Sequence, residues 1–272
     1  AWQATAPFNS TSFSTMSFDI GDINNDRVAE FFSADMYPYE QSDEALRPWQ
    51  RVLSNLEAQP VPPNNIQQIQ NTLLFRDETT YSDFAQEYAV SASGWSWSSK
   101  FGDLNQDGFL DLYVVNGMIA QELFANLPDD ELVEANQVFR NDKGAGFVPM
   151  PEWGLESQSS GRGMSMADLD NDGDLDIIIN NLNAPAQLYE NDLCGGQSLQ
   201  VDLRWQDSSN VFSIGAILRL ETTSGTYLRD VRSGSGYLSG DPARIHFGFP
   251  ADAQPLRLEV LWTDGEITTV DS

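Results

Sequence analysis

The chain has 272 residues, of which 40% are apolar and 11% aromatic, so it is long and apolar enough to bury a sizeable core. Its formal net charge is −27, from 14 basic and 41 acidic residues. This charge argues against nucleic acid or an anionic membrane as a partner, because both need a basic face, and it favours cations. The sequence holds no run of about 18 apolar residues, so no membrane span is expected.

Residues 1–37 contain the first of three similar acidic stretches, at residues 22–30, and a short strand is expected to leave it at Glu30. An insertion is expected over about residues 38–75, because the first and second acidic stretches lie about twice as far apart as a propeller blade of about 40–50 residues requires. Within this insertion we predict a helix from about Ala45 to Leu56, capped near Ser42. A second helix is predicted to start at Asn64 or Asn65 and to end near Leu74.

The middle of the chain repeats one order of elements. A strand at residues 95–101 leads into the second acidic stretch, 103–111, and then into a buried strand at 112–115. A second insertion is expected over about residues 118–136, with a helix start at Pro128. After it the order returns, with strands at 137–141, 161–167 and 177–179 around the third acidic stretch, 168–176. Strands and acidic loops that recur at intervals are typical of a β-propeller.

The pattern changes at Gly195–Gly196, where we place a domain boundary. The part from residue 196 to 272 has no acidic stretch, and strands are expected at 199–203, 216–220 and 256–262, with hairpin turns at Ser224-Gly225 and Asp264-Gly265. We therefore expect an all-β protein. It consists of a partial or complete β-propeller with helical insertions over residues 1–195, followed by a small β-sandwich-like domain over 196–272.

The third acidic stretch places five aspartates at alternate positions from 168 to 176. Such crowding is costly unless a cation lies among the carboxylates, and hard oxygen ligands with a glycine at the sharp turn are typical of a calcium site. An EF-hand begins with the same pattern, but it requires a glutamate at the twelfth position. That position holds Ser33, Val114 or Ile179 here, and the flanking segments resemble strands, so the EF-hand interpretation is rejected.

Several segments resemble FG-GAP/VCBS repeats of integrin-type β-propellers, followed by an ASPIC/UnbV domain. The first resemblance rests on residues 95–103 and 161–183. The second rests on residues 214–216, 231–239, 244–248 and 260–265. The combination resembles the family of secreted FG-GAP/VCBS proteins that end in ASPIC/UnbV, related to cartilage acidic protein. Propellers of this family have about seven blades, so the resemblance implies a partial or shortened propeller that other chains or missing sequence would complete.

By position, the resemblance implies calcium ligands at the first, third, fifth and ninth positions of each stretch, with the backbone carbonyl of the seventh. The implied ligands are Asp22, Asn24, Asp26, Val28 and Glu30; Asp103, Asn105, Asp107, Phe109 and Asp111; and Asp168, Asp170, Asp172, Asp174 and Asp176. The first stretch departs from the pattern at Arg27, where glycine is expected, and at Glu30, where aspartate is expected. Two calcium sites are therefore expected, and the first stretch is a weaker third candidate.

These observations favour a secreted or cell-surface protein, extracellular or periplasmic, in which calcium is structural. The expected function is binding or assembly, through recognition of a protein or glycan, cell adhesion, or the building of a surface structure. The alternative is an enzyme that acts on polysaccharide, or its accessory domain. No catalytic residue is assigned, because the only histidine, His246, lies in an alternating strand and conventional triads cannot be assembled. The single cysteine, Cys194, excludes a disulfide within the chain and is expected to be a small, partly buried thiol. The absence of an initiating methionine and a signal peptide suggests a processed or incomplete chain.

Overall fold

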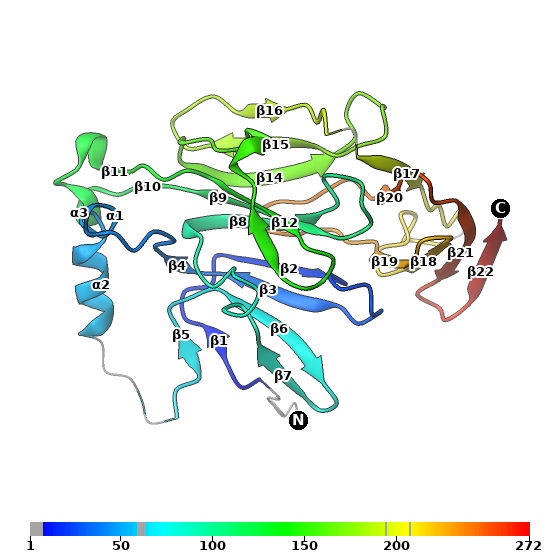
Figure 1. The fold of residues 1–272 in the computed structure, drawn as a ribbon, viewed down its shortest axis with the longest axis horizontal. Helices are drawn as coiled ribbons and strands as arrows, with labels where there is room; N and C mark the ends of the chain where they lie inside the picture. Colours follow the sequence, from blue (N-terminus) through cyan, green and yellow to red (C-terminus); the bar gives the residue numbers. More distant parts are fainter. Residues whose placement is uncertain (1–7, 59–61, 63, 194, 207) are drawn as a thin grey trace.

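The computed structural model describes residues 8–58, 62, 64–193, 195–206 and 208–272. Cys194 falls outside the described residues, so its predicted burial is not tested. The described chain is predominantly β, and Figure 1 shows three sheets stacked above one another, with the helices at one end and the C-terminal strands at the other. This arrangement confirms the prediction of an all-β, propeller-like fold.

The three sheets are the blades, and each is an antiparallel meander. Blade 1 contains β2 (Ser17–Gly21), β3 (Glu30–Ala34), β6 (Thr72–Asp77) and β7 (Thr80–Asp83) in that order. Blade 2 contains β8 (Gly94–Gly102), β9 (Asp111–Asn116), β12 (Gln137–Asn141) and β13 (Phe147–Pro149), with β4 (Met36–Tyr37) at its β8 edge. Blade 3 contains β14 (Gly161–Ala167), β15 (Asp176–Asn181) and β16 (Gln187–Tyr189).

Blade 2 has both faces covered, because it lies between the other two blades. All six residues of β9 are buried, and its side chains enter two cores, one shared with blade 1 and one shared with blade 3. In blade 3 only one face is covered, so Ile178 is 38% exposed and its cross-strand partner Leu188 is 64% exposed. The continuous apolar run at residues 112–115 is thus explained by burial on both faces of the strand.

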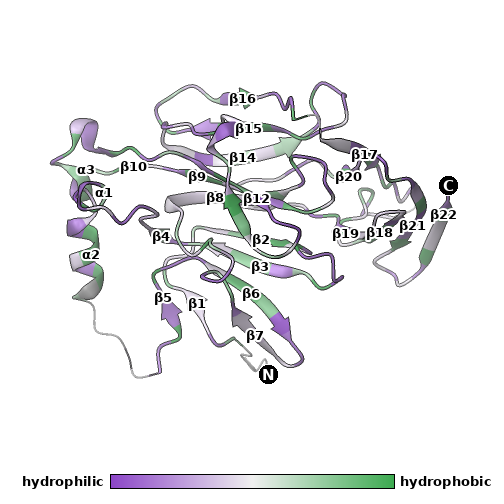
Figure 2. Ribbon diagram, in the orientation of Figure 1, coloured by the Kyte–Doolittle hydropathy of each residue, from purple (hydrophilic) through white to green (hydrophobic). Residues whose placement is uncertain are grey.

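The first insertion lies between β3 and β6, two neighbouring strands of blade 1, and contains one predicted helical region. Ser42 caps α1 (Asp43–Leu46), accepting a hydrogen bond from the Ala45 amide, and α2 (Gln50–Glu57) follows after a break. Polar and apolar residues alternate along α2 (Figure 2), and its Trp49 end packs on Trp95 of β8. The second predicted helix is wrong. Residues 67–68 form β5 (Gln67–Gln68), paired with β1 (Thr11–Ser12), and β6 follows, because Leu73 and Leu74 pair with β3 in blade 1.

The second insertion is compact and apolar on its inner side. It contains β10 (Met118–Ile119), α3 (Gln121–Phe124), a single 3-10 turn at Pro128–Asp130 and β11 (Glu131–Leu132). Phe124 and Leu132 pack with Trp49 and Trp95, so the two insertions share one apolar cluster at the helical end of the molecule. No helix in the described part of the chain is long and apolar enough to cross a membrane.

The C-terminal strands form two sheets around a core of their own. One sheet pairs β17 (Gly196–Val201) with β20 (Ile245–Pro250), and the other has the order β19 (Thr226–Asp230), β18 (Ile217–Thr222), β21 (Pro255–Leu261) and β22 (Ile267–Asp271). Leu218 and Val260 from one sheet meet Phe247 and Phe249 from the other. Two sheets packed over one core form a small sandwich, as the sequence predicts.

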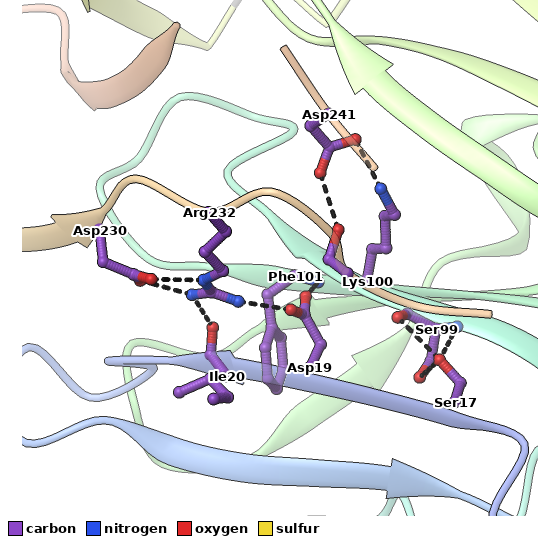
Figure 3. Close-up of polar contacts among 10 residues, drawn as sticks. Ser17, Asp19, Ile20, Ser99, Lys100, Phe101, Asp230, Arg232 and Asp241 are labelled. Carbon is purple, nitrogen blue, oxygen red and sulfur yellow. Dashed lines mark hydrogen bonds and ion pairs between the residues drawn. The ribbon is translucent and has the colours of Figure 1, made fainter. Parts of the chain in front are cut away.

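The segment between β19 and β20 joins the sandwich to the first strands of all three blades. The Gly236 amide donates to the Phe18 carbonyl of β2, the Tyr237 amide donates to Ser98 Oγ of β8, and Ser239 Oγ accepts from the Met164 amide of β14. Two ion pairs strengthen the contact (Figure 3): Lys100 Nζ lies 2.6 Å from Asp241 Oδ1, and Arg232 Nη1 lies 2.6 Å from Asp19 Oδ1. Lys100 and Asp19 are buried, so the C-terminal segment supplies charges that blades 1 and 2 need.

Candidate metal centre

The three acidic stretches occupy one equivalent position in the blades. Each is the loop that joins the first strand to the second: loop 1 (22–30) between β2 and β3, loop 2 (103–111) between β8 and β9, and loop 3 (168–176) between β14 and β15. The hairpins that precede β8 and β14 in the sequence, β6–β7 and β12–β13, belong to blades 1 and 2. The three loops therefore lie at the same end of adjacent blades.

All three loops have the same backbone. The fourth residue is left-handed in each case, with φ of 59° at Asn25, 56° at Gln106 and 69° at Asn171. The sixth residue also has positive φ, 73° at Arg27, 94° at Gly108 and 105° at Gly173. Glycine adopts this conformation without strain, whereas a residue with a Cβ atom costs about 1 kcal/mol, so Arg27 is strained where the other two loops are not.

Two hydrogen bonds recur in every loop and orient its first and last carboxylates. The amide of the sixth residue donates to the first carboxylate: Arg27 to Asp22 at 3.0 Å, Gly108 to Asp103 at 2.9 Å and Gly173 to Asp168 at 3.1 Å. The amide of the second residue donates to the ninth: Ile23 to Glu30 at 3.1 Å, Leu104 to Asp111 at 3.0 Å and Leu169 to Asp176 at 2.8 Å. Glu30 thus takes the place of the aspartate in the other loops.

The residue at the third position differs between the loops, and this difference decides whether three carboxylates lie close together. In loops 1 and 2 the third residue is asparagine, and its amide donates to the fifth residue, Asn24 to Asp26 at 3.0 Å and Asn105 to Asp107 at 3.1 Å. Loop 3 has Asp170 at that position. Among the described residues, a set of three acidic groups whose ligand atoms lie within 4.8 Å of one another occurs only there, in Asp168, Asp170 and Asp176.

The seventh residue is expected to bind the metal through its carbonyl. Its backbone amide donates a hydrogen bond to the carboxylate of the fifth residue, which holds it in place. Val28 donates to Asp26 at 2.8 Å, Phe109 to Asp107 at 2.9 Å and Asp174 to Asp172 at 3.1 Å. The side chain of Asp174 is also buried, and its Oδ1 has no hydrogen-bond partner. Sequence reasoning assigned Asp174 only a carbonyl role, and the structure adds a buried carboxylate at this position.

Burial gives these carboxylates unusual electrostatics. It raises the pKa of Asp22 to about 6, of Asp103 to about 7 and of Asp174 to about 7, and neighbouring carboxylates add to each increase. Burial also raises the pKa of Glu30 to about 8. A bound cation would reverse these shifts, because it favours the ionised form.

The Asp22 side chain provides a direct test of whether loop 1 fits a cation. Asp22 is 2% exposed, its Oδ2 accepts from Arg27, and its Oδ1 is buried without a hydrogen-bond partner. A buried carboxylate oxygen without a partner is costly. The donor set of carboxylate and amide oxygens suits a hard cation such as calcium, so all three loops fit the ion that the sequence predicts.

Two asparagines that the sequence analysis did not assign connect neighbouring loops. Asn141 Nδ2 donates to the carbonyls of Leu110 in loop 2, at 2.9 Å, and Ile23 in loop 1, at 2.8 Å. Asn191 Nδ2 donates in the same way to Leu175 in loop 3, at 3.2 Å, and Leu104 in loop 2, at 2.8 Å. The available signal was an Asn-Asp pair after each hairpin strand, at 141–142 and 191–192.

The C-terminal sandwich covers loops 2 and 3, and at loop 2 Gly196 of β17 lies against Gln106 and Gly248 of β20 lies against Asp103. Gln200 of β17 donates to Asp168 Oδ2, and His246 Nε2 of β20 lies 3.0 Å from the Gly173 carbonyl. Burial lowers the pKa of His246 to about 4, so the ring is neutral at pH 7. His246 is thus a strand residue, as predicted, and it also contacts a metal loop. Gln200 had no sequence signal that would mark it as a neighbour of Asp168.

Comparisons with known families match one segment that includes loop 3 and one segment in the C-terminal sandwich. The model of an FG-GAP-like repeat matches residues 121–179, which include loop 3, and the ASPIC and UnbV model matches residues 206–272. The chain therefore contains an FG-GAP-like repeat and an ASPIC and UnbV segment. This confirms the resemblance that the sequence analysis inferred from residues 161–183 and from the segments between 214 and 265, whereas residues 95–103 lie outside the matched repeat.

Three similar proteins are all named cartilage acidic protein 1. The chain is 34% identical to cartilage acidic protein 1 of Xenopus tropicalis over 149 residues, 50% of the chain and 22% of that protein. It is 31% identical to the human protein over 158 residues, 54% of the chain and 23% of that protein, and the mouse protein gives the same identity. The chain spans under a quarter of the length of these relatives. The similarity thus covers about half of this chain and a small part of much longer proteins.

Proposed function

We propose that the chain is a calcium-binding extracellular module, in which calcium in the three loops holds the blades and the C-terminal sandwich together. The observation that carries the proposal is the common loop geometry. Three loops of different sequence share positive φ at the fourth and sixth residues and the same pair of backbone hydrogen bonds to the first and ninth carboxylates. Equivalent geometry in all three supports one shared ligand.

A structural role for the metal is supported by what surrounds the loops. The asparagine bridges join loop 1 to loop 2 and loop 2 to loop 3, and β17 and β20 lie against loops 2 and 3. An ion that orders one loop would therefore order its neighbours. The proposed biological role is recognition of a protein or glycan, or assembly of a surface structure, outside the cell. This role is supported by the match of residues 121–179 to an FG-GAP-like repeat, by the similarity to cartilage acidic protein 1 and by the acidic composition.

Isothermal titration of the metal-free chain with calcium tests the metal proposal. We expect binding to loops 2 and 3, weaker binding to loop 1, and an increase of several degrees in the melting temperature. In Asp170→Asn, loop 3 loses one carboxylate of its cluster, so one binding step should weaken by about tenfold or more. Glu78→Gln, an exposed change in the turn between β6 and β7, is the matched control and should leave all binding steps unchanged.

A melting temperature that is the same in calcium and in excess chelator would contradict structural calcium. Polysaccharide hydrolysis assays in calcium test the catalytic alternative. Turnover abolished by mutation of one carboxylate outside the loops would replace the binding role with an enzymatic one.

A further inference from the structure

A cavity of about 390 Å³ lies between the metal loops and the C-terminal sandwich. Its blade side includes the first aspartates of loops 1 and 2, Asp22 and Asp103, and its sandwich side includes Arg229 of β19 and His246 of β20. A second cavity of about 280 Å³ adjoins it, because both contain His246 and Arg244 in their walls, and the second also contains Asp168 of loop 3. The first carboxylate of every metal loop therefore faces this interdomain space.

Most charges at one end of the cavity already have partners. Figure 3 shows Arg232 bound to Asp19, Asp230 and the Ile20 carbonyl, and Asp241 bound to Lys100. Arg244 pairs with Asp202, with Nη2 2.9 Å from Oδ2. These ion pairs hold the sandwich against the blades. Because the charged groups at that end are already paired, they do not require a ligand.

Arg229 is different. Its Nη1 donates to the neighbouring Leu228 carbonyl at 2.8 Å, its guanidinium carbon lies 5.7 Å from the centre of the Phe247 ring, and its Nη2 is buried without a hydrogen-bond partner. Among the described residues, no carboxylate lies within 4.0 Å of its nitrogens. A buried guanidinium with a free N–H is costly unless an anion or another acceptor reaches it.

His246 places an acceptor in the wall of the same cavity as this donor. His246 Nε2 lies against the Gly173 carbonyl, which can only accept, so Nε2 carries the proton and the buried Nδ1 is an acceptor without a partner. The cavity thus offers a cationic donor, Arg229, and a neutral acceptor, His246 Nδ1, between apolar walls such as Ile20, Met166 and Leu228.

We propose that this interdomain cavity binds a hydroxylated carboxylate, specifically a uronic acid, either free or at the end of an acidic polysaccharide. The carboxylate of the ligand accepts from Arg229, a hydroxyl group donates to His246 Nδ1, and the C–H faces of the sugar lie on the apolar walls. The proposal rests on the calcium loops in one respect, since bound calcium compensates the charges of Asp22 and Asp103 that would otherwise repel an anion.

The test is calorimetric titration of the full chain with D-glucuronate and with a short oligouronate, in saturating calcium and in chelator. Saturable binding of either ligand is expected, stronger in calcium, and the tighter of the two identifies the source. Arg229→Gln should weaken binding by about tenfold or more, the effect of losing one charge-assisted hydrogen bond. Arg257→Gln, an exposed arginine on β21 outside the cavity, is the matched control and should bind as the wild type does.

Ile217→Trp provides a second variant that leaves Arg229 intact. Ile217 contributes to the wall of the cavity and is 38% exposed, so a larger side chain can enter the space without disturbing the core, and it should abolish binding. Acetate and D-glucose should each bind at least about tenfold more weakly than glucuronate, because one lacks the hydroxyl groups and the other lacks the charge.

The proposal is overturned if neither uronate binds in calcium or in chelator, if acetate or glucose binds as well as glucuronate, or if Ile217→Trp binds normally. Calcium titration of the same samples separates this result from the metal proposal. A chain that binds calcium but no uronate loses only the cavity proposal.

Discussion

At the scale of single residues, loop 1 shows how one side chain affects both the backbone and the electrostatics of a site. Arg27 has φ of 73° where loops 2 and 3 have glycine, and its positive charge lies in a loop that would hold a cation. Its amide still makes the same hydrogen bond to the first aspartate as in the other loops. The loop therefore keeps its shape at a cost in free energy.

Arg27→Gly should relieve both effects. We expect the metal-free chain to gain about 1 kcal/mol in free energy of unfolding, because the left-handed strain is removed, and loop 1 to bind calcium more tightly. Arg27→Gln is the matched control, since it removes the charge but keeps the Cβ atom. It should tighten calcium binding without stabilising the metal-free chain. Urea unfolding in chelator and calcium titration measure the two effects, and equal metal-free stability of the Gly and Gln variants would contradict the strain argument.

At the scale of elements, the blades are connected at their loop ends by side chains as well as by apolar faces. Asn191 follows β16 and reaches loop 2 in the neighbouring blade as well as loop 3 in its own, and Asn141 does the same one blade earlier. In blade 1, β3 pairs with β6 in the same register as β9 pairs with β12 in blade 2. The position equivalent to Asn141 is therefore Arg76. Among the described residues, loop 1 therefore receives an asparagine bridge from blade 2 but none from its own blade.

Asn191→Ala should affect two loops at once. Loss of the donor leaves the Leu104 and Leu175 carbonyls without this partner, so we expect a cost of about 1–3 kcal/mol in free energy of unfolding and weaker calcium binding in loops 2 and 3. Asn180→Ala, an exposed asparagine on β15, is the control and should cost less than about 0.5 kcal/mol. Weakening confined to one calcium step, measured by calorimetry, would show that the bridge does not couple the loops.

At the scale of the whole molecule, the net charge of −27 and the buried loop carboxylates both make the metal-free chain more stable when carboxylates are protonated. Burial raises the pKa of Asp103 to about 7, so the native metal-free chain binds a proton there that the unfolded chain does not bind above about pH 4. The stabilisation from this group is complete below about pH 4 and is lost as the pH rises through about 7. Metal-free stability should therefore increase on mild acidification, unlike that of proteins whose carboxylates are paired.

The prediction is an opposite pH dependence in the two metal states. In chelator the melting temperature should rise as the pH falls from 8 to 6, whereas in limiting calcium it should fall, because protons compete with the ion for the carboxylates. Asp103→Asn isolates one group, and in chelator it should reduce the stability difference between pH 8 and pH 6 by about 1–2 kcal/mol. Thermal melts at four pH values provide the measurement. A metal-free melting temperature that falls on acidification would contradict the argument.

The errors of sequence reasoning also have physical causes. The predicted helix from residue 64 or 65 to Leu74 is wrong because strand pairing overrides the local helix propensity. Leu73 and Leu74 pair with β3 in blade 1, and Leu73 enters the core there. Asn141 and Asn191 gave only a weak signal, because their bonds reach carbonyls that are distant in the sequence. Nothing in the local pattern around Arg229 indicates that its neighbours come from loops 1 and 2.

The sequence by itself determined the features whose physics is local. The alternation of acidic residues, the glycine at the sixth position of two loops and the apolar strand after each loop identify the acidic loops and the all-β class, because ligand spacing and turn conformation depend on neighbouring residues. Only the tertiary structure decided which faces the blades share, how residues 231–241 contact all three first strands, and which charges meet between Arg229 and the loops. Those contacts join residues that are distant in the sequence, and their free energy depends on burial that no single stretch of sequence specifies.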